Sequence, residues 1–341
     1  MQILSTWTLQ THPRTKNDTI LHMGTRILIG LSFAGLSIVG FASTFIFGAA
    51  LTRGCGVSPE VLSFLRFAIA GLVLLVTGAS TQAGRNALLG LSRREWLSIL
   101  WIGPVGTALM AWCVFMGCAR VSAANASMAD ALTPLMIFSV AALKNRRLSL
   151  RELLGLLLGF AGALLVIQVI TLNGLALAAY STGDVFVLLA AATWAIYTVY
   201  GRRIIGERGS LVFSAWTMLV GAMTIGLVLP FGSFSWPETS HAWIMTISLG
   251  LVSTLMPFWA WNAAQNYLSM TVLGVSAYFT PVAAVAMALL FLGESASLLQ
   301  WLGTIVIVIS ALCTSSYGGG GESRTRVRNR INQTSTRVVC L

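Results

Sequence analysis

Charged residues are scarce in this 341-residue sequence. Asp, Glu, Lys and Arg together make up 9% of the chain, and only 10 residues are acidic. A soluble globular protein carries about 25% charged residues. Hydrophobic residues make up 56% of this chain, and its mean hydropathy is +0.83. The scarcity of charge excludes an ordinary soluble domain and predicts a protein that lies in a lipid bilayer.

Groups that serve catalysis or metal binding are also sparse. The three histidines, His12, His22 and His241, lie outside the expected spans, and no HExxH, GxSxG or phosphotransfer motif occurs. The five cysteines form no CxxC pair and no metal-ligand spacing. No ATP-binding loop is present. We therefore expect no catalytic residues, no metal and no cofactor, and we expect transport, if any, to draw on a gradient or a partner.

Long apolar runs are what the sequence has in place of charge. A helix needs about 20 apolar residues to cross the hydrocarbon core of a bilayer. We predict an all-α membrane protein with ten transmembrane helices, at 27–51, 57–78, 96–118, 121–143, 149–170, 184–201, 211–233, 243–265, 270–292 and 297–316. The polar ends, 1–26 and 317–341, are expected to be disordered and cytoplasmic. Met23 lies shortly before the first span, and whether translation starts at Met1 or at Met23 stays open.

Two stretches, 103–143 and 250–290, are copies of one unit. With a constant offset of 147 residues and no gap, the first copy's Gly103, Thr107, Trp112, Thr133 and Pro134 recur as Gly250, Thr254, Trp259, Thr280 and Pro281. The duplication predicts two repeats of five helices, at 27–170 and 184–316. Because five is odd, the second repeat enters the membrane inverted. Inverted repeats are typical of secondary transporters, whose site lies between the halves near the midplane.

Basic residues set the orientation. Eighteen of the 21 Lys and Arg residues lie before the first span, after the last span or in alternate connections between spans, against Arg53 and Arg120 in the other connections. Translocation of Lys and Arg is disfavoured, so the crowded side is predicted to be cytoplasmic, together with both termini. This topology accounts for the net charge of +11, and nucleic-acid binding is not needed to explain it.

Two charges, Arg66 and Asp130, lie deep in predicted spans. A charge at the bilayer centre costs about 2.5–3.5 kcal/mol, so each is expected to face protein or water. Each lies nine residues after the outer start of its helix, which predicts a similar depth. We predict that they share one polar cavity. Either they form an ion pair, or Arg66 is structural and Asp130 alone binds a substrate or a proton.

Polar side chains gather on one face of three helices. Ser122, Asn125, Asp130 and Thr133 share an arc of 121–143; Ser269, Ser276 and Thr280 share one in 270–292; and Trp259, Asn262, Gln265 and Asn266 lie between them. These faces are predicted to meet around a water-filled pocket. Pro134 and Pro281 each remove a backbone hydrogen bond, which predicts a kink and, as the sharper hypothesis, a gating point. The almost purely apolar span 297–316 is expected to face lipid or the partner subunit of a homodimer.

The chain resembles the EamA family of the drug/metabolite transporter superfamily over about residues 27–316. The resemblance is carried by Leu65-Arg66-Phe67, Leu132-Thr133-Pro134, Thr280-Pro281, Gly183-Asp184 with Trp194-Ala195-Ile196-Tyr197, and Leu292-Gly293-Glu294 with Gln300 and Gly303. It implies an inverted bundle of five plus five helices, a central cavity, and transport of amino acids, other metabolites or drugs, commonly as export. The first repeat departs from the pattern, because Leu143-Lys144-Asn145-Arg146 lacks the acidic residue of the second. A mechanism that needs a symmetric pair of glutamates is therefore disfavoured.

The sequence thus predicts a secondary transporter that moves a small metabolite across the cell membrane by alternating access. We expect Trp194, Tyr197, Trp259 and Tyr278 to make apolar and aromatic contacts with the substrate, Asn125, Asn262 and Gln265 to form hydrogen bonds, and Asp130 to bind a cationic group or a coupled proton. A nucleotide-sugar or phosphate-ester carrier is one alternative, which would need more cavity cations than Arg66. A channel-like facilitator is the other, and it would conduct without saturation.

Overall fold

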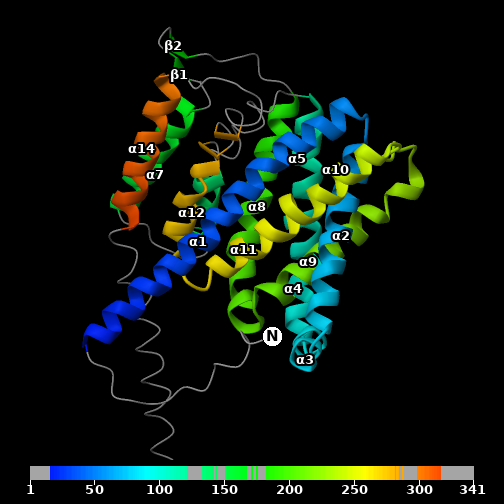
Figure 1. The fold of residues 1–341 in the computed structure, drawn as a ribbon, viewed down its shortest axis with the longest axis horizontal. Coiled ribbons are helices and arrows are strands. Elements are labelled where there is room, and N and C mark those ends of the chain that lie inside the picture. The colour runs from blue at the N-terminus through cyan, green and yellow to red at the C-terminus, as the bar shows by residue number, and fades with distance from the viewer. Residues whose placement is uncertain are drawn as a thin grey trace, which may run out of the picture.

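The computed structural model describes residues 16–120, 133–141, 143, 150–166, 170–171, 174–175, 182–280, 282–283, 286–287 and 298–315. These residues form a bundle of helices (Figure 1). The α-helices are α1 (Lys16–Ala49), α2 (Pro59–Ala79), α3 (Gln82–Leu89), α4 (Arg93–Gly103), α5 (Met110–Arg120), α7 (Leu150–Val166), α8 (Thr182–Arg208), α9 (Ser210–Gly226), α10 (Ser240–Gly250), α11 (Met256–Ala264), α12 (Met270–Ser276) and α14 (Leu298–Ser315).

The structure also contains four short helical segments and one small strand pair. Three of the segments are π-helical, namely η1 (Ala50–Gly54), η2 (Pro104–Leu109) and η4 (Leu251–Leu255), and η3 (Leu229–Phe231) is a 3₁₀ turn. The strands β1 (Ile170–Thr171) and β2 (Gly174–Leu175) pair antiparallel. The π turns η2 and η4 continue directly into α5 and α11, so each adds one residue to a helical turn without ending its helix.

Six helices in the described part are long and apolar enough to cross a membrane. They are Thr25–Gly54, Pro59–Ala79, Arg93–Arg120, Val185–Arg208, Ser210–Phe231 and Ser240–Ala264. They coincide with six of the ten predicted spans. Two further spans correspond to the shorter apolar helices Leu153–Gly162 and Trp301–Ser310, and the spans 121–143 and 270–292 include residues outside the described ranges. The helices are those of a membrane protein, and the total of ten remains a prediction.

The first helix begins earlier than the hydropathy indicates. α1 starts at Lys16, inside the segment 1–26 for which the sequence suggested no regular structure. Once a helix is nucleated, each added residue gains one hydrogen bond, so a helix extends readily past its apolar part. The apolar residues Ile20, Leu21 and Met23 lie in this extension.

Polar caps fix where several helices begin. The Ser92 hydroxyl accepts from Glu95 N, and the Glu95 carboxylate accepts from Ser92 N at 2.6 Å, which forms a capping box at the start of α4. Thr81 and Thr239 cap α3 and α10 in the same way with one hydroxyl each. These caps satisfy backbone N–H groups that the first turn of a helix leaves unbonded.

The main hydrophobic core lies between the two halves of the chain. Most of its buried residues come from α2, α4, α5, α8, α9 and α11, and they include Phe67, Ile99, Tyr197, Phe213 and Trp261. α7 and α14 pack side by side at one edge of the bundle (Figure 1). They share a separate cluster with Phe138 and Tyr278.

The π turns are packed reciprocally. η2, in the first half, contacts α8 and α9 of the second half, and η4, in the second half, contacts α1 and α2 of the first. Pro257 follows η4 and has no N–H to offer the preceding turn. Within that turn, Ser253 O accepts a hydrogen bond from Thr44 Oγ1 of α1 at 3.1 Å. Each π turn therefore joins the first and second helices of the opposite half to its own helix.

Candidate functional site

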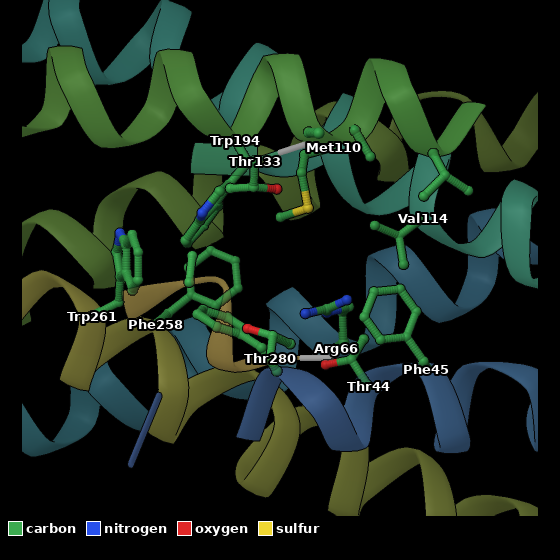
Figure 2. A pocket seen from close by; sticks show the side chains of 15 residues that line it. Thr44, Phe45, Arg66, Met110, Val114, Thr133, Trp194, Phe258, Trp261 and Thr280 are labelled. Atoms are coloured by element: carbon green, nitrogen blue, oxygen red, sulfur yellow. The ribbon is translucent and has the colours of Figure 1, made fainter. Parts of the chain in front are cut away.

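A cavity lies in the middle of the bundle, between helices from both halves of the chain (Figure 2). Its volume is about 70 Å³, counted as the space open to the centres of water-sized spheres. One water molecule needs about 10–15 Å³ in this measure, so the cavity has room for several. The lining residues are Phe41, Thr44, Phe45, Arg66, Met110, Val114, Thr133, Val187, Ala190, Ala191, Trp194, Phe258, Trp261, Ala277 and Thr280.

Aromatic rings form one side of the cavity. The Trp194 centroid lies 5.2 Å from that of Phe41 and 4.9 Å from that of Phe258, both edge to face. Trp261 lies 5.7 Å from Trp194, and Tyr197 stacks on Trp194 at 5.0 Å. Aromatic pairs at such separations add to the stabilisation from burial. We call Phe41, Trp194, Phe258 and Trp261 the aromatic wall; it offers a ligand a fixed apolar surface.

Arg66 places a positive charge against the aromatic wall. Its side chain, from α2, is 2% exposed and extends toward the cavity (Figure 2). Nε donates to Thr254 Oγ1 of η4 at 2.9 Å, while Nη1 is buried and has no hydrogen-bond partner. The guanidinium carbon lies 5.0 Å from the Phe67 ring centroid and 5.9 Å from that of Phe258. The charge is thus held by one hydroxyl and by aromatic faces.

Several polar residues predicted for the site lie beside the cavity and bond one another. Asn262 Nδ2 donates to Tyr197 Oη at 2.7 Å and to Ser214 Oγ at 2.8 Å. Gln265 Nε2 donates to Asn262 Oδ1 at 3.1 Å, and its own Oε1 is buried without a partner. All four residues are buried, and none lines the cavity. Their hydrogen bonds join α8, α9 and α11 next to the aromatic wall.

Of the four aromatic residues predicted to contact the substrate, one lines the cavity. Trp194 lines the cavity, whereas Tyr197 stacks behind it. Trp259 is half-buried and packs edge to face on Phe33, with centroids 5.4 Å apart, and it does not line the cavity. Tyr278 is also outside the lining, because its hydroxyl donates to Leu156 O of α7 at 2.9 Å in the separate cluster at the edge of the bundle.

The remaining predicted residues divide into buried and undescribed ones. Pro134 is buried at the start of the helical residues 133–141, next to Thr133 of the cavity lining. Asn125, Asp130 and Pro281 lie outside the described residues. The predicted pairing of Arg66 with Asp130 therefore stays a prediction.

Most of the lining was missed because it is apolar. On α8, Val187, Ala190, Ala191 and Trp194 follow the spacing of one helical face, with small residues beside a large ring. On α11, the lining residues Phe258 and Trp261 are three residues apart and share one face, from which Trp259 points away. The pattern that could have predicted this lining is a row of small residues on the same helical face as a tryptophan. The polar residues instead mark places where helices contact one another.

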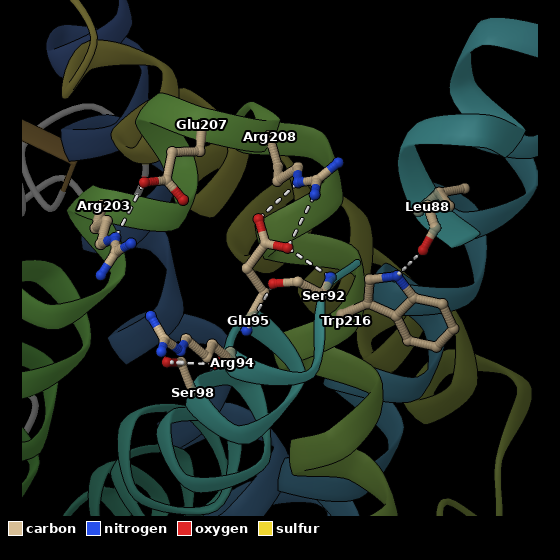
Figure 3. A network of polar contacts seen from close by, with 9 residues as sticks. All are labelled: Leu88, Ser92, Arg94, Glu95, Ser98, Arg203, Glu207, Arg208 and Trp216. Carbon is tan, nitrogen blue, oxygen red and sulfur yellow. Dashed lines mark hydrogen bonds and ion pairs between the residues drawn. The ribbon is translucent and has the colours of Figure 1, made fainter. Parts of the chain in front are cut away.

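A second polar network joins the two halves where α4 begins and α8 ends (Figure 3). Arg208 donates to both Glu95 oxygens, from Nε at 2.6 Å and from Nη2 at 3.0 Å. Glu95 also belongs to the capping box with Ser92. Nearby, Trp216 Nε1 of α9 donates to Leu88 O of α3 at 3.1 Å. In the part of the chain that the structure describes, no group of three or more His, Cys, Asp or Glu residues could hold a metal ion.

Comparison with known proteins yields a family and several relatives. A family model described as the EamA-like transporter family matches residues 28–168 and 181–316. The uncharacterized transporter YyaM of Bacillus subtilis is 24% identical over 264 residues, which cover 76% of this chain and 85% of YyaM. The aromatic amino acid exporter YddG of Ancylobacter novellus is 24% identical and is covered to 87%, with 74% of this chain aligned.

A further relative and a solved structure extend the comparison. The "Probable terminal-alkyne amino-acid exporter" of Streptantibioticus cattleyicolor is 26% identical, and the alignment covers 76% of this chain and 84% of the relative. One crystal structure matches with a TM-score of 0.67 at 23% identity and covers 87% of this chain and 99% of its own. At this identity the match shows a shared fold and says nothing of a shared substrate.

Proposed function

The chain belongs to the EamA-like transporter family, as its sequence motifs indicated, and on that premise we propose that it is a secondary transporter that moves a small metabolite across the cell membrane by alternating access. The cavity carries the proposal, since it lies between the two halves and is lined by α1, α2 and α5 on one side and by α8 and α11 on the other. A site between two helical units is the arrangement that alternating access uses. Relatives of this chain are transporters, which favours this function over an enzymatic one.

The proposed substrate is an amino acid or a drug-like compound with an apolar or aromatic part. The aromatic wall supports this assignment, because it presents fixed ring surfaces to any ligand in the cavity. Two relatives carry names that describe amino acid export, and we propose export for this chain as well. Asp130 is proposed as the site of a coupled proton or of a substrate cation.

The proposed architecture is two inverted five-helix repeats, at 27–170 and 184–316, with both termini in the cytoplasm. The reciprocal contacts of η2 and η4 support it, because helices related by a two-fold axis exchange contacts in this way. The basic residues support the orientation. A nucleotide-sugar or phosphate-ester carrier is disfavoured, because Arg66 is the one basic residue among the described lining residues.

Counterflow in proteoliposomes tests the proposal. Purified protein would be reconstituted with an unlabelled amino acid inside, and the entry of the labelled compound measured across a panel, with and without a pH gradient. A carrier gives saturable entry that substrate on the opposite side accelerates. An entry rate that rises linearly with concentration and does not depend on substrate on the opposite side would identify a channel. If no compound of the panel enters, the amino acid assignment is wrong. Trp194→Ala, which opens the aromatic wall, is expected to reduce the flux.

A further inference from the structure

Arg66 carries a charge for which the described residues supply no counter-ion. It is 2% exposed, and among the residues that the structure describes its guanidinium group has one side-chain hydrogen-bond partner, the neutral hydroxyl of Thr254 at 2.9 Å. Burial of a charge is costly unless an opposite charge or several hydrogen bonds compensate for it. Charges retained in the middle of a membrane protein usually serve its function. A ligand anion in the cavity would supply the opposite charge that the described residues lack.

The N–H groups of Arg66 that make no hydrogen bond indicate which kind of anion would fit. A guanidinium group has five N–H donors, and Nη1 uses none of its own here, although it is buried. The rings of Phe67, Phe115 and Phe258, at 5.0, 5.2 and 5.9 Å, attract the charge but accept no directed hydrogen bond. The planar donor fork matches the two oxygens of a carboxylate best. A carboxylate that entered the cavity would lie within reach of the guanidinium group, which belongs to the lining.

The apolar part of the ligand has its place beside this charge. Phe258 is shared between the two features, since its ring lies 5.9 Å from the Arg66 guanidinium carbon and 4.9 Å from the Trp194 ring. The charge and the aromatic wall are thus adjacent, within reach of one small molecule. We propose that Arg66 binds the carboxylate of the transported compound, and that the substrate is an amphipathic compound with one carboxylate, whose apolar group lies against Trp194, Phe258 and Trp261. This inference rests on the proposed function.

The number of cations sets the charge of the ligand. Among the described lining residues Arg66 is the one basic side chain, so the cavity matches a single negative charge. Phosphate monoesters carry almost two charges at neutral pH and would need a second cation. The two features of the cavity are thus proposed to bind different parts of the ligand. Arg66 binds the carboxylate, and the aromatic wall contacts the uncharged remainder.

A matched pair of probes tests this division in the full-length protein. 3-Phenylpropanoate and 3-phenylpropanamide have the same shape, but only the first is an anion, and calorimetry in lipid nanodiscs gives both dissociation constants. The wild type is expected to bind the acid at least about tenfold more tightly than the amide, which is the lower end for a hydrogen bond to a charged group. Arg66→Gln is expected to remove this preference, so that acid and amide bind with similar dissociation constants. Arg66→Lys keeps the positive charge but lacks the planar guanidinium group. Its preference for the acid is expected to lie between those of the wild type and Arg66→Gln.

A second variant keeps the test valid if Arg66→Gln does not fold. Thr254→Val retains the guanidinium group but removes the hydroxyl that holds its Nε in place, so the less well positioned group is expected to prefer the acid severalfold less. Equal binding of acid and amide by the wild type overturns the inference, as does failure to bind either probe. An undiminished preference in folded Arg66→Gln also overturns it.

The proposed function can fail independently of this inference. Preferential binding of the acid without any saturable counterflow of panel compounds would remove the transporter proposal and leave the carboxylate site standing. Saturable counterflow by a protein that does not distinguish acid from amide would remove the carboxylate site and leave the transporter proposal.

Discussion

The π turns η2 and η4 lie at matching positions of the two similar sequence stretches, but their threonine side chains make different hydrogen bonds. The Thr107 hydroxyl of η2 contacts only backbone, at 2.5 Å from Gly103 O and 2.9 Å from Thr217 O. The Thr254 hydroxyl of η4 donates to Leu249 O at 2.7 Å and accepts from Arg66 Nε. The duplication predicts that these two threonines are equivalent, yet Thr254 binds the Arg66 guanidinium group whereas Thr107 joins η2 to α9.

This difference shows that two turns with matching sequences can have different neighbours, so that only one of them contacts a residue of the cavity lining. At η2 the neighbouring helices approach so closely that no long side chain fits, since a Cβ on Gly221 would lie 2.1 Å from Thr107 Oγ1. At η4 the place beside the threonine is taken by Arg66. The comparison assigns packing to the first turn and ligand recognition to the second. The following variants test that assignment, in order of decreasing expected effect.

The largest effect is expected from filling the close contact at η2. In Gly221→Ala the new methyl group would overlap with Thr107 and would also lie 3.2 Å from Ala108 N. Overpacking of this kind costs about 1–3 kcal/mol. The thermal unfolding midpoint in detergent should fall clearly. Gly35→Ala is the matched control, because nothing lies within 4 Å of its added Cβ, and in a helix the change should be neutral or stabilising by up to about 1 kcal/mol. Equal behaviour of the two variants would contradict the close approach.

The equivalent threonines give the sharpest comparison. Thr254→Val leaves a buried charged donor unbonded, at a cost of about 1–3 kcal/mol, whereas Thr107→Val loses a neutral hydrogen bond worth about 0.5–1.5 kcal/mol. Denaturation midpoints measured side by side should rank Thr254→Val as the less stable protein. Only Thr254→Val should change the preference for a carboxylate. If both variants shift that preference equally, the two turns do not differ in function.

Tyr197 tests whether the residues behind the aromatic wall serve stability alone. A Cβ on Gly106 of η2 would lie 2.6 Å from Tyr197 Cβ, so this tyrosine covers η2 closely. Tyr197→Phe removes the hydroxyl that accepts from Asn262 Nδ2, which should cost about 1 kcal/mol. Ligand affinity should stay within about twofold of the wild type because Tyr197 does not line the cavity. A large loss of affinity at unchanged stability would move Tyr197 into the site.

The smallest effect is expected at the ion pair between α4 and α8. Glu95→Gln removes the charged partner of Arg208, where the two side chains are 10% and 31% exposed. Glu207→Gln is the matched control, since its pair with Arg203 lies within one helix and is more exposed, at 47% and 76%. Surface pairs within a helix contribute little. The unfolding midpoint should fall slightly for Glu95→Gln and less for Glu207→Gln, and high salt should reduce the first shift. A larger shift for Glu207→Gln would contradict this ranking.

Hydropathy and the duplication were sufficient to predict six described spans and the equivalence of Thr107 and Thr254. They could not predict the cavity lining, because in a membrane protein an apolar face can meet lipid, another helix or a ligand. Polar residues were equally ambiguous. Asn262 and Gln265 were predicted to bind the substrate, and in the structure Gln265 donates to Asn262 while Asn262 donates to Tyr197. Arg66 was identifiable because a charge inside a span is rare, whereas its partner Thr254 required the fold.

The extra residue in η4 has a geometric consequence for everything that follows it. A π turn contains one residue more than an α turn, and each residue of an α-helix advances the chain by about 100° and 1.5 Å. Deletion of one residue from Leu251–Leu255 would let the helix wind evenly. That deletion would rotate Phe258 and Trp261 by about a quarter turn, away from the rings that they now touch. A single backbone insertion thereby determines which face of α11 the rest of the molecule meets.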